Sequence, residues 1–120
     1  MARILIVDDS ETERQHLSKL LLAKNHQLSI AHDAEEGLVM ARAELPDLIL
    51  MDVVMPGLNG FQATRQLSKD PMTAHIPIII VSTKDQQTDQ IWAQRQGAKA
   101  YLVKPVKKEL LYAELDKLLS

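Results

Sequence analysis

The stretch that most constrains the fold is Asp47 to Phe61, DLILMDVVMPGLNGF, where a short apolar run leads to one carboxylate and then to a turn. Leu48 to Met51 has no polar face, which is typical of a strand buried on both sides of a parallel sheet. Asp52 then lies at the carboxyl end of that strand, and the Met55 to Gly60 turn leads into a helix. Ligands of open α/β sheets bind at this edge, so Asp52 is a candidate functional residue.

Apolar runs followed by a polar residue and then by helix-like sequence occur along the whole chain. The strong runs are Ile4 to Val7, Leu48 to Met51 and Ile78 to Val81, and weaker ones are Gln27 to Ala31 and Ala100 to Val103. Five strands alternating with five helices predict an α/β fold with a parallel sheet. Right-handed crossovers favour a flavodoxin-like, doubly wound (βα)5 three-layer sandwich with strand order 2-1-3-4-5. We expect residues 1–120 to form a single domain with no output domain.

The helices are expected to differ in how firmly they are held. Ser10 and Glu13 have the spacing of a capping box at the start of the first helix, and Asn25 is a plausible left-handed stop. The helix predicted over Asp85 to Gln96 is rich in glutamine and has few apolar residues, so we expect it to be loosely packed. Trp92 is expected to be its partly buried anchor.

Composition excludes several classes of function. The net charge of −2 predicts no general attraction to nucleic acid or to an anionic membrane surface. No apolar run approaches the ~20 residues that cross a bilayer. The absence of cysteine excludes disulfides, thiolate metal sites and thiol nucleophiles. Because the chain enters a strand at Ile4 without the apolar stretch of a signal peptide, we expect a cytoplasmic protein.

Polar side chains follow four of the five predicted strands and should meet at one edge of the sheet: Asp8 and Asp9, Asp52, Ser82, and Lys104. Carboxylates placed together repel one another, and a Mg²⁺ ion, which prefers oxygen ligands, relieves that repulsion. A carboxylate can also attack phosphorus to give an aspartyl phosphate. Lys104 and Ser82 would supply a cation and a hydroxyl donor for the transferring oxygens. The set predicts a site for phosphoryl transfer onto Asp52.

Each of these residues also has a purely structural explanation. Asp8 and Asp9 suit a helix start, Asp52 suits a turn, and Lys104 before Pro105 suits a solvated loop. The functional interpretation rests on their coincidence at one edge. The four histidines lie on different elements without the spacing of metal ligands.

Over its whole length, the chain resembles the receiver domain of response regulators in two-component signalling. The matching residues are the acidic pair Asp8 and Asp9, the phosphoacceptor Asp52, the hydroxyl residue Ser82, the lysine Lys104 and the switch aromatic Tyr101. The resemblance implies Mg²⁺ bound by Asp9, Asp52 and the backbone carbonyl of Val54, with Asp8 helping through water. It also implies a cis Lys104–Pro105 bond and a histidine kinase as phosphodonor.

The resemblance further implies a switch in which phosphorylation of Asp52 draws in Ser82 and lets Tyr101 turn inward. The changed surface would be the fourth helix, fifth strand and fifth helix, and we expect a reader protein to contact exposed side chains there: Gln87, Gln90, Gln94, Lys108 and Tyr112. Such a protein is not an enzyme acting on other substrates, since it catalyses only its own phosphorylation and dephosphorylation. We expect a monomer that binds no nucleic acid.

The segments MARILIVDDS and MDVVMPGLNGFQATRQLSKD, with the stretch from Thr83 to Val106, resemble more narrowly the single-domain regulators of type IV pilus twitching motility. Two positions depart from the common pattern. Thr83 is bulkier than the usual neighbour of Ser82, and the Val54 side chain cannot position an attacking water. We therefore expect slow hydrolysis of the phosphoryl group.

Three other functions are weighed against this interpretation. A dehalogenase-like phosphatase needs an Asp-x-Asp motif after the first strand, where this chain has Asp8-Asp9-Ser10. A flavin or nucleotide carrier needs a phosphate cradle, which the acidic Asp8 to Glu13 loop does not provide. A pseudo-receiver would bind partners without phosphorylation, which the full set of site residues disfavours. Whether the chain activates a target or drains phosphate from a shared kinase stays open.

Overall fold

The computed structural model describes residues 1–120 as five strands alternating with five helices. The strands are β1 (Arg3–Val7), β2 (Gln27–Ala31), β3 (Leu48–Met51), β4 (Ile78–Ser82) and β5 (Ala100–Val103). The helices are α1 (Glu11–Leu22), α2 (Ala34–Glu44), α3 (Gly60–Lys69), α4 (Gln87–Gln96) and α5 (Lys108–Leu119).

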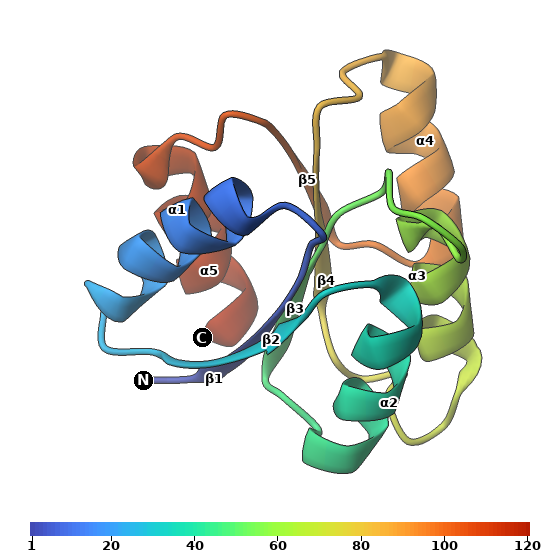
Figure 1. Cartoon of the computed structure of the whole chain (residues 1–120), viewed down its shortest axis with the longest axis horizontal. Coiled ribbons are helices and arrows are strands. Elements are labelled where there is room, and N and C mark those ends of the chain that lie inside the picture. The colour runs from blue at the N-terminus through green and yellow to red at the C-terminus, as the bar shows by residue number, and fades with distance from the viewer.

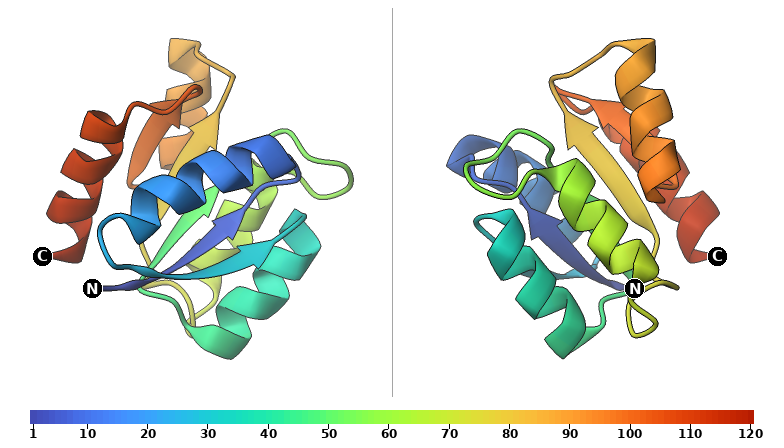
Figure 2. Two further views of the ribbon diagram at one scale, coloured as in Figure 1. Left: turned by 60° about the vertical axis from the view of Figure 1, so that its left-hand side comes forward. Right: turned by 90° about the vertical axis from the view of Figure 1, so that its right-hand side faces the viewer.

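All strand pairs are parallel, and the sheet has the order β2-β1-β3-β4-β5. Helices α1 and α5 cover one face of the sheet, and α2, α3 and α4 cover the other (Figures 1 and 2). The predicted strand order and three-layer architecture are confirmed. This order makes β1 and β3 neighbours, with Val7 beside Met51, so the residues that follow these strands also become neighbours.

The core consists of two apolar clusters, one on each face of the sheet. Alternate residues of a strand enter opposite clusters: Leu48 and Leu50 pack with α1 and α5, whereas Ile49 and Met51 pack with α2, α3 and α4. Every residue of β3 is at most 1% exposed, which confirms the prediction of a strand buried on both sides. Each such aliphatic side chain contributes about 1.5–3 kcal/mol through burial, so the central strands hold their carboxyl ends rigidly.

Local hydrogen bonds fix where the helices near the sheet edge begin. The Ser10 side chain caps α1 by accepting from Glu13 N at 3.3 Å, but Ser10 N donates to Asp8 Oδ1 at 2.8 Å. The reciprocal half of the capping box is therefore not made. A complete box forms instead at α3, where Asn59 and Gln62 each accept the other's backbone N–H. Helix α1 ends at Leu22, and Asn25 has the left-handed φ of 64° expected of it.

Helix α4 begins at Gln87, two residues later than predicted, and only Ala93 and Gln96 of this helix are buried. The prediction that Trp92 anchors α4 is wrong, because 48% of Trp92 is exposed. Tyr112 differs from expectation as well. Its hydroxyl donates to the Leu20 carbonyl at 2.7 Å, so this side chain joins α5 to α1 rather than lying free beside Tyr101.

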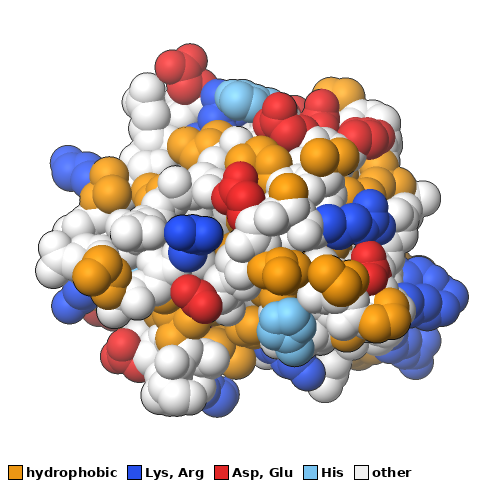
Figure 3. All heavy atoms as spheres, turned by 90° about the horizontal axis from the view of Figure 1, so that it is seen from below, with side chains coloured by type: hydrophobic (Ala, Val, Ile, Leu, Met, Phe, Trp, Pro, Cys, Tyr) orange, Lys and Arg blue, Asp and Glu red, His pale blue; other side chains and the backbone are white.

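Figure 3 views the molecule from below, the side toward which both chain ends lie in Figure 1. Acidic, basic and apolar side chains are interspersed on that face, without a continuous basic area. No helix of this structure has both the length and the apolar character needed to span a bilayer.

Candidate functional site

The candidate site lies at the carboxyl edge of the sheet, where β1 and β3 end side by side. Asp8 directly follows β1, and Asp52 directly follows β3. The ladder continues one step past the strands, because Asp52 N donates to the Val7 carbonyl at 2.9 Å. Asp8 is 1% exposed and Asp52 6% exposed, so backbone pairing brings two carboxylates together where water has little access.

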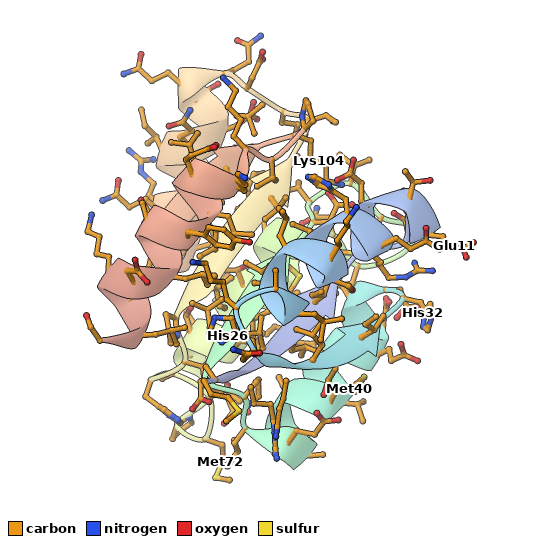
Figure 4. The ribbon with its side chains drawn as sticks, turned by 90° about the vertical axis from the view of Figure 1, so that its left-hand side faces the viewer. Glu11, His26, His32, Met40, Met72 and Lys104 are labelled. Carbon is orange, nitrogen blue, oxygen red and sulfur yellow. The ribbon has the colours of Figure 1, made fainter.

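Lys104 reaches the two buried carboxylates from the end of β5. Its Nζ lies 2.9 Å from Asp8 Oδ2 and 3.4 Å from Asp52 Oδ1, and its side chain is 8% exposed. The backbone N–H of Lys104 donates to the Ser82 carbonyl at 2.9 Å, and the Lys104–Pro105 bond is cis, as the resemblance implied. Figure 4 shows Lys104 at the end of the molecule where α1 begins near Glu11.

One lysine does not fully compensate two buried carboxylates. Burial, reinforced by the charge of Asp8, raises the pKa of Asp52 to about 6 in spite of the attraction to Lys104. Burial works to lower the pKa of Lys104, but the hydrogen bond to Asp8 and the charge of Asp52 outweigh it and raise that pKa. The site therefore holds excess negative charge and would gain from a further cation.

Asp9 adds a third carboxylate at the rim. Carboxylate oxygens of Asp8, Asp9 and Asp52 lie within 4.8 Å of one another, and Asp9 is exposed to solvent. No hydrogen bond within the protein occupies the carbonyl of Val54, and 59% of that residue is exposed. A partly open set of hard oxygen donors with surplus negative charge fits Mg²⁺, which keeps several of its waters when bound to proteins. A Mg²⁺ site at these residues is what the resemblance to receiver domains implied.

Ser82 and Tyr101 meet at the backbone of Lys84. Ser82 is fully buried, and its hydroxyl oxygen accepts from Lys84 N at 3.1 Å. The Tyr101 hydroxyl donates to the Lys84 carbonyl at 2.7 Å, while its ring packs against the core cluster beneath α4. Burial raises the pKa of the Tyr101 phenol. The two residues expected to form a switch thus hold the same loop, the one that leads from β4 to α4.

Several residues that shape the site were not singled out in the sequence. An added Cβ at Gly60 would collide with the Asp52 carbonyl, so only glycine lets α3 start this close to β3. Arg14 Nη1 donates to the Asp8 carbonyl at 2.9 Å. Glu35, on α2, accepts from Leu58 N at 2.9 Å. The turn predicted from Met55 to Gly60 could have pointed to Gly60. The contacts of Arg14 and Glu35 depend on tertiary structure and could not be found from the sequence.

The histidines do not gather at this site or at any other. His26 precedes β2 and His32 follows it, and the two lie well apart in Figure 4. The group of potential metal ligands that the structure brings together is the aspartate triad.

Comparison with known proteins decides the family. The model of the response regulator receiver domain matches residues 4–116. The chain belongs to the receiver domain family. Receivers are phosphoacceptor signalling modules, and the burial and pairing of Asp52 fit that class.

Curated relatives and solved structures agree with this assignment. The receiver is 56% identical to Protein PilH of Pseudomonas aeruginosa over 120 residues, which cover 100% of this chain and 99% of PilH. It is 41% identical to Response regulator PleD of Caulobacter vibrioides over 117 residues, 98% of this chain, but spans only 26% of PleD. Chemotaxis protein CheY4 of Vibrio cholerae superposes with a TM-score of 0.91 at 31% identity, covering 99% of both chains. A CheY-like receiver domain protein of Methanospirillum hungatei gives 0.91 at 27% identity, over 99% of this chain and 94% of that one.

Proposed function

We propose that this receiver acts as a stand-alone response regulator that takes a phosphoryl group from a histidine kinase onto Asp52. The observation that carries the proposal is the Asp52 carboxylate itself, which is buried, carries a raised pKa and lies 3.4 Å from the Lys104 ammonium. In the transfer, a carboxylate oxygen of Asp52 attacks phosphorus, the bond from phosphorus to the imidazole nitrogen breaks, and the released histidine takes up a proton. The ionised form of Asp52 is the nucleophile.

The surrounding residues lower the barrier by placing charge and hydrogen-bond donors near the transferring group. Asp9, Asp52 and the Val54 carbonyl are proposed to hold Mg²⁺, with Asp8 acting through a water molecule. When bound, the ion neutralises charge on the phosphoryl oxygens. Lys104 already bridges Asp8 and Asp52, and the same ammonium supplies a cation to the phosphoryl group. Asp8 keeps that lysine oriented.

The proposed readout is a change at the α4-β5-α5 surface through Ser82 and Tyr101. Gln87, Gln90 and Gln94 line a shallow hollow of ≈ 470 Å³ between α4 and β5, together with Tyr101. Helix α4 is held by few buried residues, so a small free energy gained at the phosphate can shift its population. A protein that reads the signal is proposed to bind this hollow.

The likeness to PilH supports a place in type IV pilus twitching motility and chemotaxis-like signalling. We propose a cytoplasmic monomer that works through protein contacts and binds no nucleic acid. A second candidate function is a phosphate sink for a shared kinase, which would use the same Asp52 site without a reader at the α4-β5-α5 surface.

The test is intact-protein mass spectrometry after incubation with a small phosphodonor, with and without Mg²⁺, on the native protein and on Asp52→Asn. A Mg²⁺-dependent gain of one phosphoryl group that Asp52→Asn abolishes is the expected result. If the native protein gains no phosphoryl group and also fails to bind beryllofluoride, the chain is a pseudo-receiver and the proposal is wrong.

A further inference from the structure

The loop between β3 and α3 carries the Val54 carbonyl and is closed at its base. Gly60 N donates to the Val53 carbonyl at 3.0 Å, and Gly60 packs directly against the backbone of Asp52. The base of the loop therefore moves with β3. Between these points Val54, Pro56 and Gly57 are exposed, whereas Met55 is buried in the core cluster and Leu58 packs against that cluster.

A single hydrogen bond joins the tip of this loop to another element of the protein. Leu58 N donates to Glu35 Oε1 at 2.9 Å, across 23 residues of sequence. The other polar contacts of the loop are local: Val53 N donates to Asp52 Oδ1 at 2.9 Å, and Asn59 N donates to the Gln62 side chain at 3.1 Å. Besides the apolar contacts of Met55 and Leu58, the polar tie of the tip to another element is therefore the one to Glu35 of α2.

The backbone of the loop fits closely around the same carboxylate oxygen. Gly57 has a left-handed φ of 75°, and a Cβ added there would lie 2.9 Å from Glu35 Oε1. The hydrogen bonds from Leu58 N and from its own backbone N–H lower the pKa of Glu35, so the bond to the loop is charge-assisted at neutral pH. Glu35 also lies in the first turn of α2, where a negative charge is favoured by the helix dipole.

We propose that Glu35 is a positioning residue for the metal site: by holding Leu58 it fixes the loop that presents the Val54 carbonyl. The inference rests on the proposed function, since it concerns the same Mg²⁺ ion. Without Glu35 the loop samples more conformations, and binding the ion then includes the cost of ordering it. The outer-shell partners of metal ligands act in this way in other sites.

The adjacent residue Glu36 provides a matched control. It is exposed like Glu35 and also accepts a backbone N–H, that of His32 at 2.7 Å, but it makes no hydrogen bond to the loop. Glu35→Ala and Glu36→Ala remove the same charge from neighbouring positions of one helix. A difference between them in Mg²⁺ affinity therefore reports the loop contact rather than the loss of charge.

The experiment is a Mg²⁺ titration by calorimetry on the native protein, Glu35→Ala, Glu35→Gln and Glu36→Ala. Glu35→Ala is expected to weaken Mg²⁺ binding by about tenfold, the lower end of the range for loss of an outer-shell partner. Glu36→Ala should leave the affinity close to native, and Glu35→Gln, whose amide oxygen still accepts from Leu58 N, should recover most of it. Amide hydrogen exchange at Leu58 should be faster in Glu35→Ala than in Glu36→Ala in the absence of metal.

Failure of the inference about Glu35 can be told apart from failure of the proposed function. Equal Mg²⁺ affinities for Glu35→Ala and Glu36→Ala, or unchanged exchange at Leu58, would overturn the role of Glu35 while leaving the phosphoacceptor site in place. A native protein that binds no Mg²⁺ at all would overturn the metal part of the proposed function and this inference with it.

Discussion

Replacing Asp52 by Asn should stabilise the metal-free protein, and the effect should depend on pH. The folded protein raises the pKa of Asp52 from 3.8 to about 6, chiefly through burial. At about 1.36 kcal/mol per pKa unit, this rise corresponds to about 3 kcal/mol. Because the rim of the site is open to water at Asp9, solvent screening reduces the expected value to about 1–2 kcal/mol.

The direction in which stability changes with pH follows from proton binding at Asp52. Between pH 3.8 and about 6 the folded protein keeps the Asp52 proton that the unfolded chain has lost, so stability falls as pH rises through this window. Asn resembles the neutral carboxyl group and does not titrate. Asp52→Asn should therefore match the native protein near pH 4 and exceed it by about 1–2 kcal/mol at pH 8.

Urea unfolding in EDTA at several pH values between 4 and 8 measures this difference directly. The slope of the unfolding free energy against urea should be the same for both proteins, so that midpoints can be compared. Saturating Mg²⁺ should close the gap at pH 8, because the ion compensates the charge of the native site. An Asp52→Asn variant that is no more stable than native at pH 8 without metal, or a gap that widens as the pH falls, would refute the reasoning.

Three further predictions follow from the same site. Lys104→Met should cost on the order of 3 kcal/mol in metal-free unfolding at pH 8, because it leaves Asp8 without its buried cation; an unchanged urea midpoint would contradict this. Gly60→Ala should destabilise by about 1–3 kcal/mol, since its Cβ collides with the Asp52 carbonyl. The check is thermal unfolding against Gln66→Ala, an exposed position of the same helix. The aspartyl phosphate should decay more slowly than that of typical chemotaxis receivers. Thr83→Ala should shorten its lifetime, measured in a radiolabel chase. Equal lifetimes for the native protein and Thr83→Ala would show that Thr83 does not slow hydrolysis.

Much of the fold could be predicted because its strands are nearly continuous apolar runs. Ile4 to Val7 and Leu48 to Met51 are buried on both sides, and only the interior strands of a parallel sheet provide that environment. Once these strands are neighbours, Asp8 and Asp52 must lie together, and the approach of Lys104 follows from the position of β5 in the same sheet. The side chains of the candidate site could therefore be predicted from the residues that directly follow the strands.

Packing of α4 was harder to predict from composition. Ile91, Trp92 and Ala93 are consecutive, and a helix turns about 100° per residue, so the three cannot share one buried face. Ala93 takes the core position at 1% exposure, while Ile91 is 43% and Trp92 48% exposed. Favouring the largest apolar side chain as the anchor was therefore wrong.

Contacts between distant segments gave no sequence signal. The Glu35 bond to Leu58 joins residues 23 apart, and it exists because the carboxyl edge of the sheet brings the start of α2 beside the β3–α3 loop. The capping box of α1 is incomplete for a local reason: Asp8, two residues before Ser10, accepts the Ser10 N–H that Glu13 would otherwise accept. Pairwise spacing rules do not include such competition.

The most direct test of the central claim is to locate the phosphoryl group. The native protein is phosphorylated with a small phosphodonor and Mg²⁺, the acyl phosphate is reduced with borohydride, and the modified residue is identified by peptide mass spectrometry. The structure predicts reduction at Asp52 alone, because both carboxylate oxygens of Asp8 accept hydrogen bonds, from Ser10 N and from Lys104 Nζ, whereas Asp52 accepts only through Oδ1, from Val53 N. Reduction at Asp8 or Asp9 with Asp52 intact would contradict the account.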